Sequence, residues 1–284
     1  MNNHYFIEGT AHLKPSLDYE NKELYPKFHL KVDELKELLN FRVSNKIPTT
    51  FYKFGDGDYY FLKKQHVGSA MPGKRALRKP YFLINHKKFV QGSKKNDFYT
   101  TLLPEMHTRM FYELFDKNFD FPSEAVYGLL ANKWIFQNFE NIGLIGADKK
   151  LDLIKNLMEF DQYKDYLGIE KFNDYIKIPQ KYACDNLSRT IKNVRKQLLT
   201  SSSSLFLVGV GHVKSGLLHE LKEYKNAVFL DVGVGIDAIA GIINKNRPYF
   251  GLWENYHIKD YFDYENLDVL INSPNDSFGK IKYL

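Results

Sequence analysis

The chain has 284 residues, 44% hydrophobic and 26% charged, with a formal net charge of +6, which is typical of a globular protein with a sizeable core. Its single cysteine, Cys184, excludes an internal disulfide framework and fits a reducing compartment. The first residues lack a signal-peptide pattern, and no apolar run approaches the ~20 residues of a membrane span, so we expect a cytoplasmic protein without a transmembrane segment.

Hydrophobic periodicity predicts the elements of the first half of the chain. Residues 1–30 show no clear period and are interpreted as an N-terminal arm. Apolar residues at helical spacing predict a helix over Val32–Arg42, and β-branched and aromatic residues predict a strand over Thr50–Phe54. Further helices are expected over Tyr99–Asp116 and over Ser123–Phe139, the second with its serine as N-cap.

A basic block lies between the strand and these helices. From Lys63 to Lys95 the chain has ten basic residues and no acidic one, and Gly and Pro residues punctuate it as in a loop. A block of one sign attracts anions such as phosphates, nucleic acid or acidic lipid; the alternative is a solvated surface. Peripheral membrane contact through this block therefore stays open.

The second half of the chain alternates short apolar strands with helices. Strands are expected over Ile142–Ala147, over Leu205–His212 together with its turn, and over Ala227–Gly233. The expected helices are Leu151–Phe160, one from Asp185 as N-cap to the Ser201–Ser204 run, Val213–Tyr224 and Ile236–Asn244. Such alternation indicates parallel β-α units. We predict an α/β fold with a Rossmann-like, mostly parallel sheet flanked by helices on both faces.

Ligands of open parallel sheets bind outside the carboxyl ends of the strands, and Asp56-Gly57-Asp58 follows the first strand. Mg²⁺ and Mn²⁺ prefer oxygen ligands and commonly use one or two carboxylates together with substrate phosphates. Asp56 and Asp58 are therefore candidate metal ligands. The alternative is a hairpin turn, which Asp-Gly between two strand-like runs also favours.

Two later turns carry glycines. Gly209-Val210-Gly211-His212 leads a strand into a helix, where backbone N–H groups can approach a phosphate. The pattern is not a full G-x-G-x-x-G, because Lys214 occupies the third glycine position. Tight packing of the turn is the alternative, and His212 could contact a phosphate or cap the turn.

The second turn is Asp231-Val232-Gly233-Val234-Gly235. Asp231 could hold a ribose hydroxyl, and the turn is similar to the acidic-glycine turn of methyltransferases that bind S-adenosylmethionine. Asp237 follows as a helix N-cap or first-turn acid. Arg247 is suited to a bidentate phosphate contact, although an exposed arginine is the ordinary case.

Together these motifs resemble the GT-D-type glycosyltransferases. The hallmark of that family is Arg-Phe-Gly-Asp-Gly-Glu at the end of a strand, and this chain has Lys53-Phe54-Gly55-Asp56-Gly57-Asp58 there. Lys53 thus replaces Arg, and Asp58 replaces Glu. Further matches run in family order from Ala131-Asn132 to Arg247-Pro248-Tyr249.

The resemblance implies one GT-D-like domain over residues 1–284, with residues 250–284 as a C-terminal extension. It implies transfer of a sugar from a nucleotide-sugar donor, with UDP expected, to a glycan or glycoprotein acceptor. Mn²⁺ or Mg²⁺ would be held by Asp56 and Asp58, and Asp237 is a candidate general base. Residues expected at the donor are Lys53, Gly55, Gly57, Gly209, Gly211, His212, Asp231, Gly233 and Arg247.

Part of the basic block, with Lys74, Arg75 and Arg78 as candidates, would screen the diphosphate or an acidic acceptor. No nucleic acid partner is expected, and the oligomeric state is left open. Two other functions remain. One is an S-adenosylmethionine-dependent methyltransferase that uses Asp231–Gly235, and the other is a non-catalytic protein that binds polyanions through the basic block.

Overall fold

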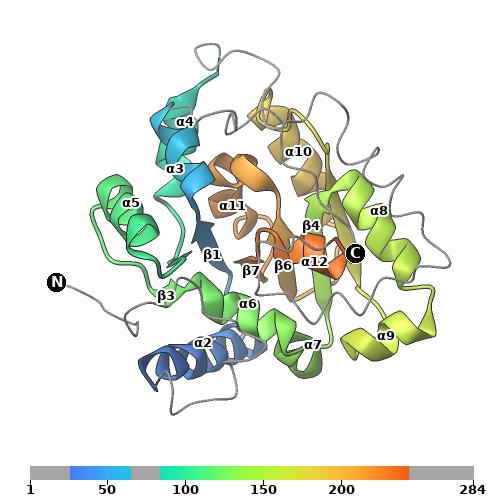
Figure 1. Cartoon of the computed structure of the whole chain (residues 1–284). Helices are drawn as coiled ribbons and strands as arrows, with labels where there is room; N and C mark the ends of the chain where they lie inside the picture. The colour runs from blue at the N-terminus through green and yellow to red at the C-terminus, as the bar shows by residue number, and fades with distance from the viewer. Residues whose placement is uncertain (1–25, 65–83, 243–284) are drawn as a thin grey trace.

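The computed structural model describes residues 26–64 and 84–242. They form a seven-stranded sheet in the order β3-β2-β1-β7-β6-β4-β5 (Figure 1). Every pair of neighbouring strands is parallel, which confirms the predicted α/β class with a parallel sheet. The strands are β1 (Thr49–Phe54), β2 (Phe98–Thr101), β3 (Phe121–Pro122), β4 (Ile142–Ala147), β5 (Asp174–Ile178), β6 (Leu205–Gly209) and β7 (Val228–Asp231).

Helices pack on both faces of this sheet, as predicted. One apolar cluster includes residues of α2 (Pro26–Ser44), α6 (Ser123–Ala131), α7 (Trp134–Asn138), α8 (Asp148–Leu157), α9 (Asp161–Leu167) and α12 (Gly235–Ile239). The other includes residues of α3 (Asp56–Lys63), α4 (His86–Ser93), α5 (Glu105–Phe115), α10 (Leu187–Leu198) and α11 (Lys214–Leu221). A short 3-10 helix, η2 (Gly211–Val213), precedes α11.

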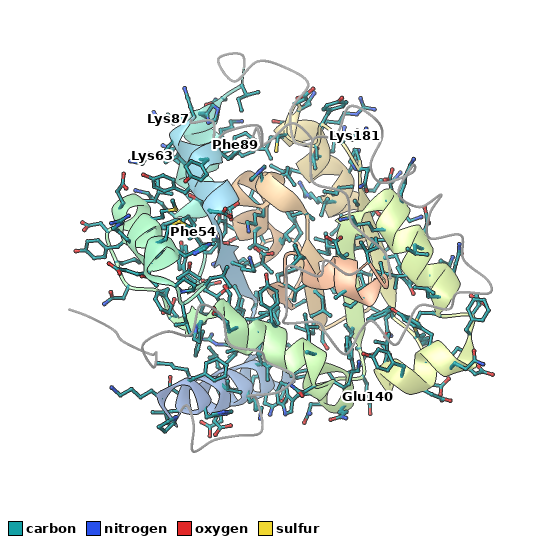
Figure 2. The ribbon with its side chains drawn as sticks, in the orientation of Figure 1. Phe54, Lys63, Lys87, Phe89, Glu140 and Lys181 are labelled. Atoms are coloured by element: carbon teal, nitrogen blue, oxygen red, sulfur yellow. The ribbon has the colours of Figure 1, made fainter. Side chains whose placement is uncertain are left out.

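The strands contribute side chains alternately to the two apolar clusters, because successive side chains of a strand point to opposite faces of the sheet. In β1, Phe51 belongs to the first cluster, whereas Tyr52 and Phe54, two positions apart, belong to the second. Phe54 is fully buried beside α3 and α5, whereas Lys63 and Lys87 point outward (Figure 2). The central strands are therefore covered on both sides and present only their ends to ligands.

The segment after β1 differs from both sequence interpretations of Asp56-Gly57-Asp58. The chain does not turn back as a hairpin, which makes that alternative wrong; it enters α3 directly at Asp56. Gly55 is the N-cap, and its backbone N–H donates to Asp58 Oδ2 at 3.0 Å. Asp58 is thus the N3 carboxylate of a capping box, a pattern that nucleates a helix.

Other element boundaries in the first half also differ from the prediction. Residues 98–101 form β2, so the helix expected from Tyr99 begins only at Glu105; the Phe-Tyr-Thr-Thr run has strand propensity, and Pro104 sets the start of α5. The helix expected over Ser123–Phe139 is two helices, broken at Lys133, whose φ is +63°. Pro122 is the N-cap of α6, and the Ser123 hydroxyl pairs instead with Thr100 Oγ1 at 3.1 Å.

In the second half, β4, β6 and β7 lie where they were predicted. The N-cap of α10 is Asn186, one residue after the predicted Asp185, because the Asn186 side chain accepts from the Arg189 N–H. Strand β5 was missed, since its Asp-Tyr-Ile-Lys-Ile pattern lacks a continuous apolar run. Helix α12 ends at Ile239, earlier than the predicted Asn244.

The N-terminal arm is shorter than predicted. Helix α2 begins at Pro26, so the last residues of that arm are helical. Residues 250–284, the predicted C-terminal extension, lie outside the described residues. Within the described part of the chain, no helix combines the length and apolar character needed to cross a membrane.

Candidate functional site

The candidate site lies where β1, β7 and β6 end. These strands are neighbours in the sheet and parallel, so their carboxyl ends meet at one edge. β1 leads into α3, β6 leads through η2 into α11, and β7 leads toward α12. Three motifs that are far apart in the sequence therefore come together there.

Lys214, the first residue of α11, joins the three strand ends. Its Nζ lies 3.0 Å from Asp58 Oδ2 and 2.9 Å from Asp231 Oδ2, and it donates to the backbone oxygen of Lys53. All three side chains of this Lys214 triad (Asp58, Lys214 and Asp231) are at most 7% exposed. The Tyr52 ring lies under the ammonium at 5.0 Å, a cation–π contact.

Mutual neutralisation is what allows these charges to be buried. Burial alone would raise the pKa of Asp58, but the Lys214 ammonium and His212 outweigh it and lower the pKa to about 2. Burial would lower the pKa of Lys214, but the two carboxylates raise it well above its ordinary value. The Asp58 carboxylate and the Lys214 ammonium are therefore both charged at neutral pH.

Asp231 is fixed by the backbone as well as by Lys214. Its Oδ2 accepts from the Lys53 N–H at 3.1 Å, and its Oδ1 accepts from the Gly233 N–H at 3.0 Å. Both oxygens of this 1% exposed side chain are thus engaged by the protein. The Asp231 carboxylate orients Lys214. A ribose hydroxyl that bound Asp231 would have to compete with the Lys214 ammonium and with the N–H groups of Lys53 and Gly233.

Asp56 and Asp58 do not converge on one point. Residues two apart on a helix lie about 200° apart around its axis. Asp56 is exposed and accepts from the Gly57 N–H at 2.8 Å, whereas Asp58 is buried against Lys214. The Lys214 ammonium and the Gly55 N–H already engage Oδ2 of Asp58, so the two carboxylates do not fit one shared cation.

His212 stands beside Asp58 on the solvent side of the triad. Its Nδ1 is 3.7 Å from Asp58 Oδ1, longer than a hydrogen bond, and has no hydrogen-bond partner among the described residues. Phe61 stacks on the imidazole with ring centroids 4.8 Å apart and planes 6° apart. The ring is thus held in place beside the carboxylate, with 16% of the side chain exposed.

The glycines of the site have different roles. A Cβ at Gly209 would lie 2.4 Å from Ile236 Cγ1 and 2.7 Å from the Gly233 backbone oxygen, so this glycine lets the start of α12 pack on β6. Gly211 has φ +59°, and no atom lies within 4 Å of the position that a Cβ would take there. This glycine thus serves a left-handed turn and faces open space. A Cβ at Gly57 would lie 3.1 Å from His212 Cε1.

Lys53 lines the same edge from the end of β1. Its side chain is 8% exposed and passes Gly233, where a Cβ would lie 3.3 Å from Lys53 Cδ. Its Nζ lies 5.5 Å from the centre of the Tyr127 ring. Gly55 borders the same ammonium, with its Cβ position 3.9 Å from Nζ. Lys53 of β1 and Lys214, which follows β6, thus place two cations on either side of the end of β7.

Two residues of this region were not among the sequence candidates. Lys214 was noted only for breaking the glycine pattern. Its signal was a cation in the first turn of a helix, where the helix dipole disfavours it, so a nearby anion was to be expected. Glu124 is fully buried in α6, accepts from the Leu103 N–H at 3.0 Å and has its pKa raised to about 7 by burial; nothing in its local sequence marked it.

Other predicted site residues lie apart from the triad or outside the described residues. Asp237 is in the first turn of α12, as predicted, and pairs with Lys150 of α8. Arg247 lies outside the described residues, as do Lys74, Arg75 and Arg78. Within the described ranges, no group of three or more His, Cys, Asp or Glu side chains could hold a metal ion.

Comparisons with known proteins give structural matches only. No protein-family model and no curated protein matches the chain. A solved structure described as a new glycosyltransferase (DUF1792) from Streptococcus sanguinis is similar over 72% of this chain and 81% of its own, with a TM-score of 0.45 and 13% identity. Another, of the domain of unknown function 1792, is described as having a distinct glycosyltransferase fold; it covers 70% of this chain and 76% of its own, with a TM-score of 0.43 and 13% identity.

Proposed function

We propose that this protein is a glycosyltransferase that takes its sugar from a nucleoside-diphosphate donor, with UDP-sugars the first donors to test. The observation that carries the proposal is the Lys214 triad, which unites the ends of β1, β6 and β7 in one charged site. These are the segments on which the sequence resembles GT-D-type glycosyltransferases. The acceptor is proposed to be a glycan or glycoprotein.

The diphosphate of the donor would meet the Lys53 ammonium at this edge of the sheet, since the charge of Lys214 is already balanced by Asp58 and Asp231. Gly211 leaves open space over the start of η2. Fixed charges that need no reorganisation stabilise the negative charge that grows on a departing diphosphate. Because Asp56 and Asp58 do not fit a shared cation, the chemistry is assigned to the side chains of the protein.

His212 is the proposed general base. With Nδ1 protonated and directed at Asp58, the other ring nitrogen, Nε2, carries the lone pair. Nε2 would accept the proton of the acceptor hydroxyl as its oxygen bonds to the anomeric carbon of the sugar. The bond from that carbon to the diphosphate breaks, and its electron pair leaves with the diphosphate. The 3.7 Å between Nδ1 and Asp58 Oδ1 is too long for a hydrogen bond, and we expect it to shorten when substrate binds.

Ligand binding separates this proposal from the other functions. Calorimetric titrations with UDP, GDP, TDP and CMP, each with and without Mn²⁺ or Mg²⁺, would be compared with S-adenosylmethionine. We expect a nucleotide to bind and S-adenosylmethionine not to bind. Binding of S-adenosylmethionine alone would replace the proposal by a methyltransferase, and binding of neither would remove both.

His212→Gln is a sharper test of the site than Asp58→Asn. Asp58 caps α3 and neutralises Lys214, so its replacement changes stability as well as chemistry. His212 is partly exposed and caps no helix, and glutamine keeps polarity without the basic nitrogen. We expect His212→Gln to keep nucleotide affinity within about threefold and to lower transfer by a factor of about 10² to 10⁴. Equal transfer by wild type and variant would remove His212 from the proposed mechanism.

A further inference from the structure

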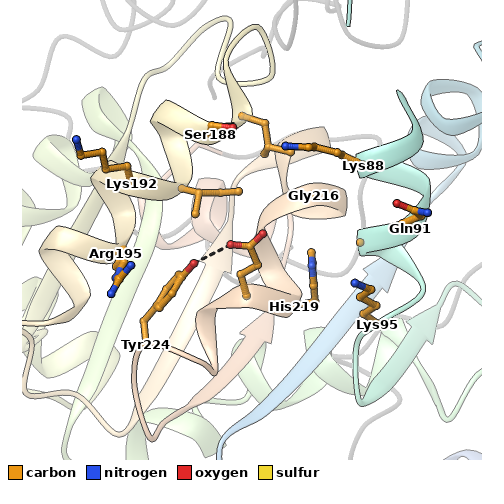
Figure 3. Close-up of a pocket in the computed structure, with 13 residues that line it drawn as sticks. Lys88, Gln91, Lys95, Ser188, Lys192, Arg195, Gly216, His219 and Tyr224 are labelled. Carbon is orange, nitrogen blue, oxygen red and sulfur yellow. Dashed lines mark hydrogen bonds between the residues drawn. The ribbon is translucent and has the colours of Figure 1, made fainter. Parts of the chain in front are cut away.

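A second charged feature lies away from the Lys214 triad, in a groove between α4 and α10 over the body of α11 (Figure 3). The groove has a volume of about 370 Å³, within the range of ligand pockets. Figure 3 shows Lys88 and Lys95 on the α4 side and Lys192 and Arg195 on the α10 side. We name these four cations and the floor between them the basic groove.

Glycines create the basic groove by letting its walls pack closely on α11. A Cβ at Gly92 of α4 would lie 2.5 Å from the Ser215 backbone oxygen, and one at Gly216 of α11 would lie 2.5 Å from Leu187 Cδ2 of α10. Both flanking helices therefore sit low against α11. Their longer side chains rise on either side and leave the concavity between them.

The charge of the basic groove is one-sided. All four cations are exposed, and none forms an ion pair with a residue in the described part of the chain. Glu220 is the acidic residue of the lining, and its carboxylate accepts from the Tyr224 hydroxyl at 2.7 Å. Four like charges around one concavity raise its positive potential, and an anion bound there relieves their repulsion.

The uncharged lining indicates what carries the anionic group. Gln91 and Ser188 offer amide and hydroxyl groups suited to sugar hydroxyls. Arg195 lies over the Tyr224 ring at 5.1 Å, so the aromatic ring and the guanidinium form a flat, partly apolar surface. Hydroxyl partners, a flat surface and cations together match a sugar that bears phosphate, sulfate or carboxylate groups.

We infer that the basic groove binds an anionic saccharide. This inference rests on the proposed function, in which the saccharide is the acceptor. Lys214 of the triad and Gly216 of the groove floor are two positions apart on α11, about 3 Å along the helix axis. Because residues two apart lie about 200° apart around a helix, the groove and the triad lie on different sides of α11, which connects the two sites.

Saccharide binding to the full-length protein tests the inference. Isothermal titration would compare a heparin-derived tetrasaccharide, a hyaluronan-derived tetrasaccharide and neutral maltotetraose. Sulfate and carboxylate arms distinguish the sources of the charge. We expect an anionic tetrasaccharide to bind at least about tenfold more tightly than maltotetraose and its affinity to fall with added salt. Equal affinity for the neutral chain would overturn the inference.

A pair of charge-reversal variants locates the binding. Lys192→Glu/Arg195→Glu is expected to weaken anionic tetrasaccharide binding by about tenfold or more. Lys155→Glu/Lys171→Glu changes the net charge equally at exposed positions outside the groove and is expected to stay within about twofold of wild type. Equal losses in both variants, or tighter binding of a single-stranded oligonucleotide than of either saccharide, would contradict a saccharide site.

The outcome is separable from that of the proposed function. Cleavage of nucleotide sugars by the wild-type protein tests the proposed glycosyltransferase function, and it can be measured without a saccharide in the basic groove. Saccharide binding by the groove variants tests the saccharide site, and it can be measured without a nucleotide-sugar donor. Donor cleavage without groove-dependent binding would refute only the inference, and groove-dependent binding without donor cleavage would refute only the proposed function.

Discussion

Replacing Lys214 by methionine is the perturbation whose size the structure determines best. Two carboxylate oxygens lie 2.9 and 3.0 Å from the ammonium, and each contact amounts to about 5 kcal/mol at an effective dielectric constant of about 20, before desolvation. Methionine keeps most of the volume but leaves two carboxylates buried without a counter-charge. We therefore expect Lys214→Met to lower the free energy of unfolding by about 3–5 kcal/mol near pH 7.

The pH dependence of that loss has a definite sign. In the wild type, the Asp58 pKa of about 2 lies below its ordinary value of 3.8, so its contribution of about 2 kcal/mol is present above pH 3.8 and is lost as pH falls through 2. In Lys214→Met, the ammonium no longer opposes the effect of burial, so we expect the pKa of Asp58 to rise. Protonation then relieves the penalty, and the cost of the substitution should shrink near pH 4.

Urea unfolding followed by circular dichroism near pH 7 and near pH 4 measures both effects. Lys222→Met is the matched control because Lys222 closes the same helix and pairs with Asp97 while 22% exposed; it should cost at most about 1 kcal/mol. Lys214→Met/Asp231→Asn should recover part of the loss, since one buried charge is removed. A Lys214→Met cost equal to that of Lys222→Met, or one that grows toward pH 4, would show that Lys214 does not neutralise the two buried carboxylates.

Three further predictions concern neighbouring residues. His212→Gln should lower kcat of transfer and leave the KM for the donor almost unchanged, because glutamine cannot accept the proton of the acceptor hydroxyl; a change confined to KM would assign His212 to donor binding instead. Burial raises the pKa of Glu124 to about 7, above its usual 4.5. The free energy of unfolding of the wild type should therefore fall by up to about 3 kcal/mol as pH rises from 4.5 to 7. In urea unfolding experiments, the free energy of unfolding of Glu124→Gln should change less over this pH range. Gly209→Ala should cost about 1–3 kcal/mol through the clash with Ile236, and Gly209→Ala/Ile236→Ala should recover part of it; purely additive losses in unfolding experiments would contradict the clash.

The sequence predicted the sheet and the location of the site because both depend on local patterns. Apolar runs such as Leu205–Val208 identify buried parallel strands, and the turns after them mark the carboxyl edge of the sheet. The same patterns predicted that Asp58 lies just after β1 and that Asp231 lies at the end of β7. What local pattern does not contain is which strands are neighbours, and here β1 lies beside β7.

The roles of the site residues depended on that pairing. Asp56 and Asp58 looked equivalent at a spacing of two, but the helical start of α3 exposes one and buries the other. Asp58 meets Asp231 only through Lys214, a residue from a third strand end. Long-range ion pairs of this kind leave no periodic signal, so composition and spacing predicted a metal site at a place where the described residues put an ammonium.

The basic block illustrates the same limit. Its one-signed charge predicted an anion partner, and four of its lysines lie in α4 or just after it. The cations that face Lys88 and Lys95 across the basic groove come from α10, about a hundred residues later in the chain. The sequence of the block alone therefore contained half of the groove.

Cleavage of a panel of nucleotide sugars would show whether the protein is a glycosyltransferase. Wild type and His212→Gln would be incubated with UDP-, GDP-, TDP- and CMP-sugars, with and without Mn²⁺ or Mg²⁺, and the released nucleotide and sugar would be quantified. We expect the wild type to release nucleotide from at least one donor and the variant to do so about 10²-fold or more slowly. Absence of release from every donor under every condition would contradict the proposed function.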